Sequence, residues 1–303
     1  MSSEKQSKEQ LHPRNRNIDR YDLKSLVNAI PELQNFIRPN KFGEDSINFS
    51  DPRAVKLLNK AILHHYYGIE FWEFPDKNLT PPIPGRADYL HYIADLLAKS
   101  NDGKVPIGEK VTCLDIGTGA SCIYPILGVT EYGWNFIATD IDSNSIASTN
   151  KIVDSNLSLK GKIESRLQKN PKNIFHGIIH SNEKIDITIC NPPFHSSHEE
   201  AQRGTRRKIK NLSGEKVKSP KLNFSGLSNE LIYEGGEYVF IQNMIKESKS
   251  FSENVKWFTT LVSKKAHLKG ILLELEKNGA KQIKNIPMGT GNKVTRVVAW
   301  TFV

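Results

Sequence analysis

The stretch Val111-Thr112-Cys113-Leu114-Asp115-Ile116-Gly117-Thr118-Gly119-Ala120-Ser121 decides the fold of this chain. Its apolar first half predicts a short buried strand, and its two glycines predict a sharp turn into a helix that runs through Leu127. Glycine has no Cβ, so the backbone of such a turn can approach a ligand closely. The stretch therefore predicts the first strand and the ligand loop of an open parallel α/β sheet.

An acidic residue follows the second predicted strand, residues 134–139. Asp140 stands at the end of this strand, about 20 residues after the glycine loop. An acid at this place accepts hydrogen bonds from the hydroxyl groups of a bound ribose. Cys122 occupies the third glycine position of a dinucleotide-binding loop, so the pattern indicates a nucleoside ligand but not a dinucleotide enzyme.

A third motif, Asn191-Pro192-Pro193-Phe194, ends the fourth predicted strand, residues 186–190. Asn191 offers a side-chain carbonyl and Pro192 a main-chain carbonyl, while the Phe194 ring can stack on a flat group. Such a corner can grip a planar group that bears an NH2. A plain turn would also explain Asn and Pro after a strand. The glycine loop upstream favours the chemical interpretation, because both motifs belong to the carboxyl edge of one parallel sheet.

The length, charge and cysteine content of the chain limit the class of protein. The 303 residues allow one main domain with an added module. Lys and Arg number 42 against 33 Asp and Glu, and the formal charge of +9 favours a polyanionic partner. The three cysteines show no Cys-x-x-Cys spacing, which is typical of a reducing compartment, and no apolar run is long enough to span a membrane. We expect a cytoplasmic protein without membrane contact, and a monomer by default.

Histidines and a cysteine flank the corner. His195 and His198 have no matching set of Cys or acidic residues, so no metal site is predicted. Cys190 would be a candidate nucleophile in a cytosine-C5 enzyme, but its place in an apolar strand favours a core residue.

Two segments carry the basic charge. Residues 1–20 have no packing period and predict a flexible basic arm, in which Arg14 and Arg16 are candidate phosphate contacts. A basic insertion is predicted at 196–235, directly after the corner, and its poverty in apolar residues favours contact with nucleic acid. Its candidate RNA-binding residues are Arg203, Arg206, Arg207, Lys208 and Lys210.

Residues 21–104 predict a module of short helices with proline-rich joints. Asp51-Pro52 is a helix start, with Asp as the N-cap and Pro at the first helical position. The stretch 79–86 is too rich in proline for a helix, which resumes at 89–97. Arg86 is thus expected at a junction of loop and helix, where its planar guanidinium suits a carboxylate.

Residues 105–303 predict the main, Rossmann-like domain. Beyond the basic insertion, the patterns predict a helix at 237–248, a fifth strand at 257–262, a helix at 268–275 and two strands within 280–303. A terminal strand pair after five αβ units predicts a seven-stranded, mostly parallel sheet with an antiparallel last strand.

The glycine loop, the acidic strand end, the Asn-Pro-Pro-Phe corner and the closing strand pair together resemble a class I S-adenosylmethionine (SAM)-dependent methyltransferase of the amino-group type. Residues 11–303 further resemble the bacterial ribosomal RNA large subunit methyltransferase F family, which is similar in organisation to eukaryotic RNA adenine-N6 methyltransferases. The strings that carry this resemblance are His12-Pro13-Arg14-Asn15-Arg16, Asn48-Phe49-Ser50-Asp51-Pro52, Pro84-Gly85-Arg86, the run from Leu114 to Pro125, and Glu234-Gly235-Gly236-Glu237.

The resemblance implies SAM as cofactor and N6-methyladenine in 23S ribosomal RNA as product, with free RNA or a large-subunit precursor as partner. Asn191 and Pro192 would bind the N6 amine and Phe194 would stack on an unpaired or flipped adenine. No general base is required, since a sulfonium already makes its methyl group electrophilic. A further cofactor contact is expected near Lys169. The implied cofactor-binding residues are Arg86, Asp115, Gly117, Gly119, Ser121, Asp140 and Asn191.

Other functions also fit parts of the sequence. A protein glutamine-N5 methyltransferase would grip an amide NH2 in the same corner, although the basic segments argue against a protein substrate. A non-catalytic RNA-binding factor of ribosome assembly would use the fold as a platform. A DNA adenine methyltransferase is disfavoured only by the family resemblance.

Overall fold

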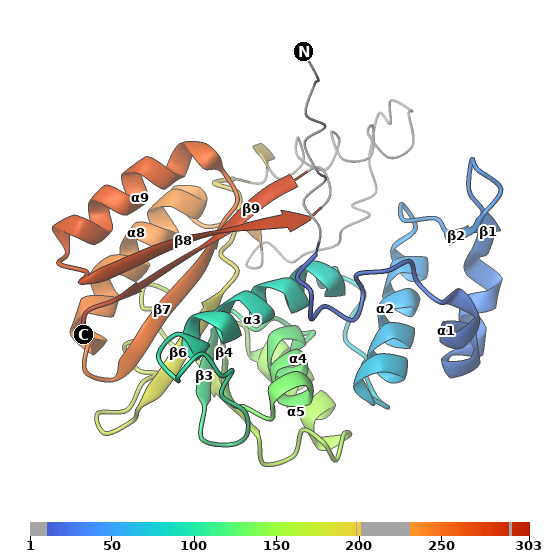
Figure 1. Ribbon diagram of the computed structural model, residues 1–303, viewed down its shortest axis with the longest axis horizontal. Helices are drawn as coiled ribbons and strands as arrows, with labels where there is room; N and C mark the ends of the chain where they lie inside the picture. Colours follow the sequence, from blue (N-terminus) through green and yellow to red (C-terminus); the bar gives the residue numbers. More distant parts are fainter. Residues whose placement is uncertain (1–10, 198, 201–230, 291–292) are drawn as a thin grey trace.

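A seven-stranded sheet forms the centre of the computed structural model, which describes residues 11–197, 199–200, 231–290 and 293–303. The strands are β3 (Thr112–Ile116), β4 (Asn135–Asp140), β5 (Ile163–Leu167), β6 (Ile185–Cys190), β7 (Val255–Val262), β8 (Gln282–Thr290) and β9 (Lys293–Thr301). Their order is β5-β4-β3-β6-β7-β9-β8 (Figure 1). Strands β3 to β7 pair in parallel, whereas β9 is antiparallel to β7 and β8. The predicted seven-stranded, mostly parallel sheet with an antiparallel last strand is confirmed.

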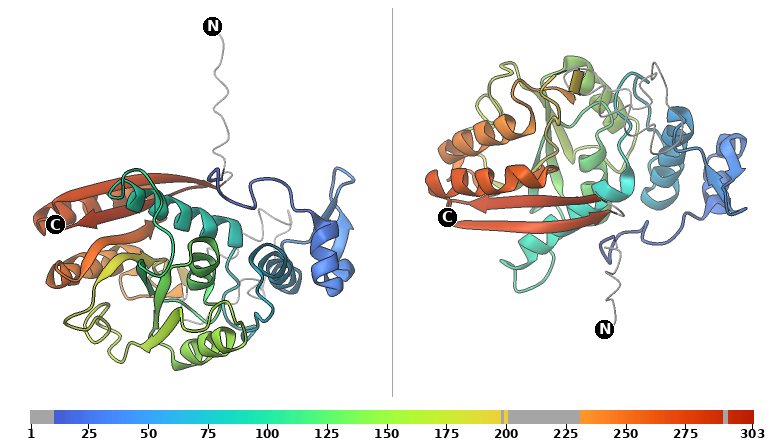
Figure 2. Two further views of the ribbon diagram at one scale, coloured as in Figure 1. Left: turned by 60° about the horizontal axis from the view of Figure 1, so that its bottom comes forward. Right: turned by 90° about the horizontal axis from the view of Figure 1, so that it is seen from above.

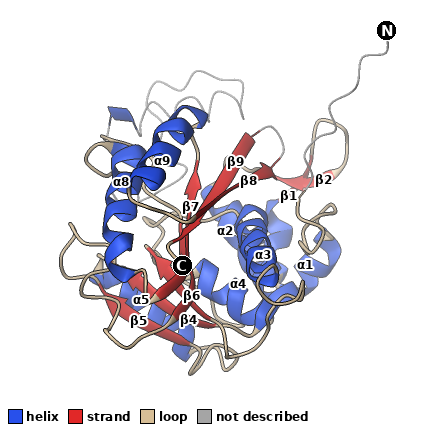
Figure 3. Ribbon diagram, turned by 60° about the vertical axis from the view of Figure 1, so that its left-hand side comes forward, coloured by secondary structure: helices blue, strands red, loops and turns tan. Residues whose placement is uncertain are grey.

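Helices cover both faces of the sheet, as Figure 3 shows. The helices α3 (Ile83–Ala98), α4 (Ile123–Tyr132) and α5 (Ser143–Asp154) cover one face, and α8 (Gly236–Ser248) and α9 (Lys265–Lys277) cover the other. Successive sheet residues alternate between the two cores: Cys113 belongs to the first and Leu114 to the second, as a strand buried on both faces requires. In the part of the chain that the structure describes, no helix has the length and apolarity needed to cross a membrane.

The N-terminal elements lie at the end of the molecule away from α9 (Figure 2), and α2 contacts α4. They are α1 (Leu23–Ala29), the 3-10 helix η1 (Pro31–Phe36), the short antiparallel strands β1 (Ile37–Pro39) and β2 (Asp45–Ile47), and α2 (Pro52–Tyr67). The predicted start of α2 is confirmed, because the Asp51 side chain accepts a hydrogen bond from the Arg53 N–H. Gly68 follows the last residue of the helix and caps it in the left-handed conformation. The β1–β2 hairpin was not predicted.

Helix α3 begins at Ile83, so the prediction that 79–86 contains no helix was wrong for its second half. Pro84 lies in the first turn of the helix. Backbone N–H groups in this turn have no acceptor within the helix, so a proline there costs no helical hydrogen bond. Arg86 is therefore part of the helix. This helix packs on α4 and reaches β8, and one apolar core runs from Leu26 to the sheet residue Phe136. The sequence before residue 104 thus contributes to the same core as the sheet.

Residues 12–17 form a segment, here called the N-terminal strap, that packs on α3. His12 and Asn15 are buried, and the Asn15 amide donates to the Pro84 carbonyl oxygen at 2.8 Å and to the Asp88 carboxylate. The His12 ring lies 2.9 Å from the Asp95 carboxylate. The prediction of a flexible arm was wrong for this segment, because hydrogen bonds of buried polar side chains replace the apolar period that sequence patterns detect.

We expect Asn15→Ala to lower the free energy of unfolding by about 1–3 kcal/mol, because it removes a buried amide and leaves the Asp88 carboxylate without that donor. The measurement is urea-induced unfolding followed by circular dichroism. Asn150→Ala is the matched control, since Asn150 is exposed on α5. Equal stability of the two variants would contradict the view that the strap is part of the folded core.

Candidate active site

A pocket opens at the carboxyl ends of β3, β4 and β6. Its lining includes Gly117 from the loop after β3, Asp140 at the end of β4, and Asn191 directly after β6. These ends meet because β3 pairs with both other strands: Ile116 lies opposite Thr139 on one side and opposite Cys190 on the other. The glycine loop and the Asn-Pro-Pro-Phe corner therefore open on the same edge of the sheet.

The glycine loop is tied to the end of β4 by its backbone. Gly117 and Gly119 have φ angles of +74° and +65°, which favour glycine. The N–H groups of Gly117 and Thr118 both donate to the Thr139 carbonyl oxygen, at 2.9 and 2.8 Å. The Gly119 N–H donates to the Asp140 carboxylate at 2.9 Å. Three backbone N–H groups thus hold the loop against the end of β4.

The helix after the loop starts in an uncommon way. Cys122, at the position where a dinucleotide-binding loop has its third glycine, takes the left-handed conformation with φ +51° and caps α4. Ser121 lines the pocket, and its carbonyl oxygen accepts a hydrogen bond of 2.8 Å from the Trp72 ring N–H. Trp72 is buried in the segment between α2 and α3, so the N-terminal part of the chain supports the glycine loop directly.

Asp140 is placed to bind hydroxyl groups. Its two carboxylate oxygens each accept one backbone N–H, from Gly119 and from Asp142, both at 2.9 Å. A carboxylate oxygen has more than one lone pair, so both oxygens retain acceptor capacity toward the pocket. The two backbone bonds fix the orientation of this carboxylate, and its binding of a ribose stays a prediction.

Asp115 is an acid buried behind the glycine loop. Neither of its carboxylate oxygens has a hydrogen-bond partner among the described residues, and the hydroxyl groups of Thr118 and Tyr124 are likewise buried without one. Burial, with a smaller contribution from the charge of the nearby Asp140, raises the pKa of Asp115 to about 7 against the opposing effects of Thr118 and Arg86. Buried polar groups without partners are rare in folded proteins and are suited to a ligand that supplies the missing partners.

Arg86 lies between the two motifs. Its Nη1 donates to the Asn191 side-chain oxygen at 3.4 Å, and its guanidinium carbon lies 5.6 Å from the centre of the Tyr124 ring. Both partners line the pocket with it. A planar guanidinium at this place can pair with the carboxylate of a ligand.

The corner presents its first residues to the pocket. Asn191, Pro192 and Pro193 line it, and Pro192 is buried. Phe194 is half-buried, lies directly after this lining, and belongs to neither apolar core. The ring is therefore not a core residue, and its stacking on a substrate base stays a prediction.

Sequence reasoning missed an aromatic part of the pocket wall. Tyr233 and Phe240 line the pocket, with their rings edge to face at 5.1 Å between centroids. The Tyr233 N–H donates to the His195 carbonyl oxygen at 3.0 Å, and its hydroxyl oxygen accepts from the Asn243 amide at 3.0 Å. The aromatic residue two positions before the glycine pair at 235–236 was the available signal.

The cofactor contact expected near Lys169 stays a prediction, and the structure places the neighbouring Gln168 in the lining of the pocket. Gln168 is buried and lines the pocket, and its N–H donates to the Asp140 carbonyl oxygen at 2.8 Å. Lys169 is exposed. Alternation along the strand end decides which of the two side chains faces inward, and the sequence did not define where β5 stops.

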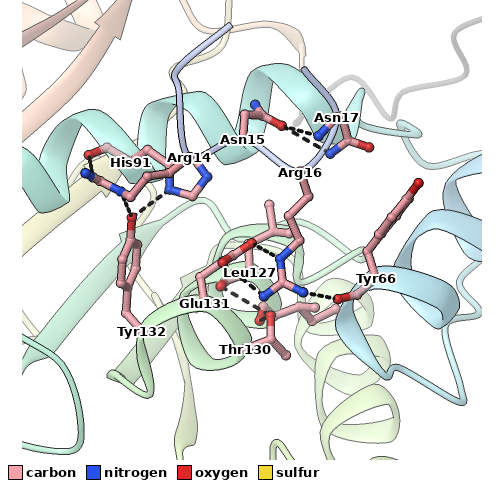
Figure 4. Close-up of polar contacts among 11 residues, drawn as sticks. Arg14, Asn15, Arg16, Asn17, Tyr66, His91, Leu127, Thr130, Glu131 and Tyr132 are labelled. Carbon is pink, nitrogen blue, oxygen red and sulfur yellow. Dashed lines mark hydrogen bonds and ion pairs between the residues drawn. The ribbon is translucent and has the colours of Figure 1, made fainter. Parts of the chain in front are cut away.

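The basic residues predicted to contact RNA fall into two groups. Arg14 pairs with Asp95 at 2.8 Å and donates to the Tyr132 hydroxyl at 3.1 Å, and Arg16 pairs with Glu131 at 2.8 Å, as Figure 4 shows for the contacts to α4. Both guanidinium groups thus hold the strap on the folded chain instead of projecting from a free arm. The candidates Arg203, Arg206, Arg207, Lys208 and Lys210 lie outside the described residues, as does His198.

The residues present fit SAM as a ligand. Asp140 suits a ribose, the glycine loop allows close backbone approach, Arg86 suits a carboxylate, and the buried carboxylate of Asp115 suits a positively charged group. When bound, SAM supplies a methyl group on a positively charged sulfur. The fold and the site together define a class I SAM-dependent methyltransferase.

Comparisons with known proteins define the family. A family profile described as RNA methyltransferase matches residues 5–303, and proteins named ribosomal RNA large subunit methyltransferase F from Serratia proteamaculans and Cytophaga hutchinsonii are 51% and 50% identical to this chain. The chain belongs to this family and is a SAM-dependent RNA methyltransferase. Both alignments cover 98% of the chain, and they cover 89% and 92% of the two relatives.

Solved structures of human METTL16 have the same fold. The catalytic domain in complex with a MAT2A 3′UTR hairpin is 29% identical, with a TM-score of 0.82 over 97% of this chain and 96% of that one. The N-terminal domain in complex with SAH, the product of SAM, is 27% identical, with a TM-score of 0.76 over 97% of this chain and 99% of that one. The predicted cofactor class is thereby confirmed.

We expect cofactor binding to release a proton from Asp115. This carboxyl group has a pKa of about 7, well above its ordinary value, so it is about half protonated at neutral pH. A cationic ligand favours the ionised form, and binding should release about half a proton at pH 7 and strengthen as pH rises from 6 to 8.

Calorimetry of SAM binding in buffers of different ionisation enthalpy measures this release. Asp115→Asn cannot release a proton and should give the same apparent enthalpy in all buffers. Proton release that persists in this variant would assign the titration to another group.

Proposed function

We propose that this enzyme methylates the exocyclic N6 of one adenine in 23S ribosomal RNA. The observation that carries the proposal is the position of Asn191 and Pro192, which line the same pocket as the glycine loop. Two carbonyl oxygens at one corner match the two N–H bonds of a planar amine. The family membership supplies the large-subunit RNA as substrate class.

The Asn191 side chain has a defined role in this mechanism. Its oxygen accepts from Arg86 at 3.4 Å, and an amide oxygen has a second lone pair for one N6 hydrogen. Proline at 192 has no N–H, so its carbonyl offers an acceptor without a competing donor. Binding both hydrogens leaves the N6 lone pair directed away from the corner, toward the part of the pocket that the glycine loop lines.

The proposed reaction needs alignment and exclusion of water, not a base. Nitrogen, methyl carbon and sulfur must lie in line, and the N6 proton leaves after the carbon–nitrogen bond has formed. Within the described residues, the pocket presents Asn191 and prolines beside the reacting nitrogen and no histidine or lysine. An adenine in a duplex cannot reach this corner, so the substrate base must be unpaired or flipped.

The aromatic part of the pocket wall, Tyr233 and Phe240, would also contact the base in this proposal. Phe194 stacks on one face in this proposal, and Tyr233, whose hydroxyl is bound by Asn243, limits the slot on the other. The METTL16 catalytic domain was solved in complex with an RNA hairpin, and the loop of a hairpin contains unpaired bases.

Asn191→Ala should abolish methyl transfer while leaving SAM binding within about threefold of wild type, because the side chain acts on the accepting amine. Transfer of tritium from labelled SAM to protein-free 23S RNA measures the reaction, and calorimetry measures the binding. Wild-type transfer by this variant would contradict the role of the corner. Labelling of glutamine in protein but not of RNA would favour a glutamine-N5 methyltransferase instead.

Mass mapping of N6-methyladenine in 23S RNA tests the substrate itself. A strain without this protein should lack one modified adenine that the wild-type gene restores and Asn191→Ala does not. Retention of every N6-methyladenine in that strain would reject the proposed target.

Tyr233→Ala should raise the KM for RNA about tenfold or more, with little change in the Kd for SAM, because stacking on a base contributes about 1–3 kcal/mol. Tyr233→Phe keeps the ring and is the matched control, with a KM near wild type. Steady-state kinetics with varied RNA separates the two variants. Equal KM values for both would show that the ring does not contact the base.

A further inference from the structure

Strand β6 ends at the corner, and its regular pairing with β7 stops before that end. Strands β6 and β7 pair in parallel, and their last register pair is Ile187 with Trp257. The next step of the same register would join Ile189 to Thr259. In a regular parallel ladder, the Thr259 N–H would donate to the Thr188 carbonyl oxygen, and the Thr259 carbonyl oxygen would accept from the Cys190 N–H.

Side chains replace these ladder bonds. The Thr259 N–H donates to the Thr188 hydroxyl oxygen at 2.9 Å, and the Thr259 hydroxyl donates to the Thr188 carbonyl oxygen at 2.5 Å. The N–H of Cys190 donates to the Tyr89 hydroxyl at 3.3 Å, and that hydroxyl lies 2.7 Å from the Thr259 hydroxyl. Tyr89 belongs to α3, so a helix outside the sheet completes the bonding of β6.

The direction of this chain of hydrogen bonds is fixed. Because the only proton of the Thr259 hydroxyl goes to Thr188, the Tyr89 hydroxyl must donate to Thr259 and accept from Cys190. All four residues are buried. Burial raises the pKa of Tyr89 well above its ordinary value, so the phenol stays protonated and able to donate.

The residue after this chain is Asn191. Cys190 is the last residue of β6, and its N–H would have no acceptor on the β7 side without the Tyr89 hydroxyl. Arg86, one turn earlier on α3, contacts the Asn191 side chain at 3.4 Å. Helix α3 therefore fixes the backbone before the corner through Tyr89 and the side chain at the corner through Arg86.

We propose that Tyr89 is a positioning residue for methyl transfer: its hydroxyl separates β6 from β7 and sets where Asn191 stands relative to the glycine loop. Tyr89 is not among the residues that line the pocket, and its ring packs edge to face on Tyr124, with 5.6 Å between centroids. Its effect on the reaction is transmitted through the backbone of β6. The inference concerns the site of the proposed function and relies on that function for the reaction assayed.

Tyr89→Phe keeps the ring and removes the hydroxyl. We expect kcat for methylation of 23S RNA to fall about tenfold to a hundredfold, because small misplacements of a reacting group have effects of this size. The Kd for SAM and the KM for RNA should stay within about twofold of wild type. A residue that only stabilised the fold would not produce this separation between kcat and KM.

Thr259→Val breaks the same chain without changing the side-chain shape, and Thr259→Ser restores the hydroxyl. The valine variant should reproduce the kcat defect of Tyr89→Phe, the serine variant should recover kcat, and the double variant Tyr89→Phe/Thr259→Val should be no worse than either single one. Additive losses in the double variant would overturn the proposal.

Hydrogen exchange gives a readout that does not depend on activity. Followed by mass spectrometry in the full-length protein, the Cys190 amide should exchange at least about tenfold faster in Tyr89→Phe than in wild type. Ser248→Ala is the matched control. The Ser248 hydroxyl is also buried, accepts from the Trp300 ring at 3.0 Å and lies at the end of α8, so its loss should leave the Cys190 amide protected.

Unchanged exchange at Cys190 in Tyr89→Phe, or an equal loss of protection in Ser248→Ala, would overturn the proposal. If wild-type enzyme transferred no methyl group to 23S RNA, the proposed function would fail, but the exchange comparison would still decide whether Tyr89 holds the end of β6.

Discussion

The parallel pairing of β3 with both β4 and β6 is the constraint on which the site depends. It brings the glycine loop, Asp140 and Asn191 to one edge although these residues are far apart in sequence. The backbone bonds from Gly117 and Thr118 to Thr139 then fix the loop against the end of β4. Each functional side chain owes its position to a strand end, which is why this edge binds ligands in open α/β sheets.

The N-terminal part of the chain is a structural component of this site. Trp72 binds the carbonyl of Ser121 behind the glycine loop, and Arg86 and Tyr89 of α3 reach the corner from the other side. The strap then holds α3 through Asn15 and other polar side chains. The N-terminal part of the chain thus supports both the cofactor loop, through Trp72, and the acceptor corner, through α3, in addition to their connection through the sheet.

The two acidic residues of the site, Asp140 and Asp115, differ in burial and in hydrogen bonding. Asp140 accepts two backbone N–H groups and lies at the pocket, whereas Asp115 is fully buried and without hydrogen-bond partners among the described residues. Burial alone would keep Asp115 partly protonated at neutral pH, and a cationic ligand reverses that preference. Two acids a short distance apart are therefore suited to different parts of one cofactor.

The sequence by itself determined the sheet, the glycine loop, the acid after β4 and the corner after β6, because strand periodicity, glycine and proline act locally. The tertiary structure alone decided the rest. The start of α3 at Ile83, the burial of the strap, the wall formed by Tyr233 and the contact of Tyr89 with Cys190 all depend on partners distant in sequence. No local pattern encodes such pairs, since the hydrogen bonds of polar side chains have neither a period nor a fixed spacing.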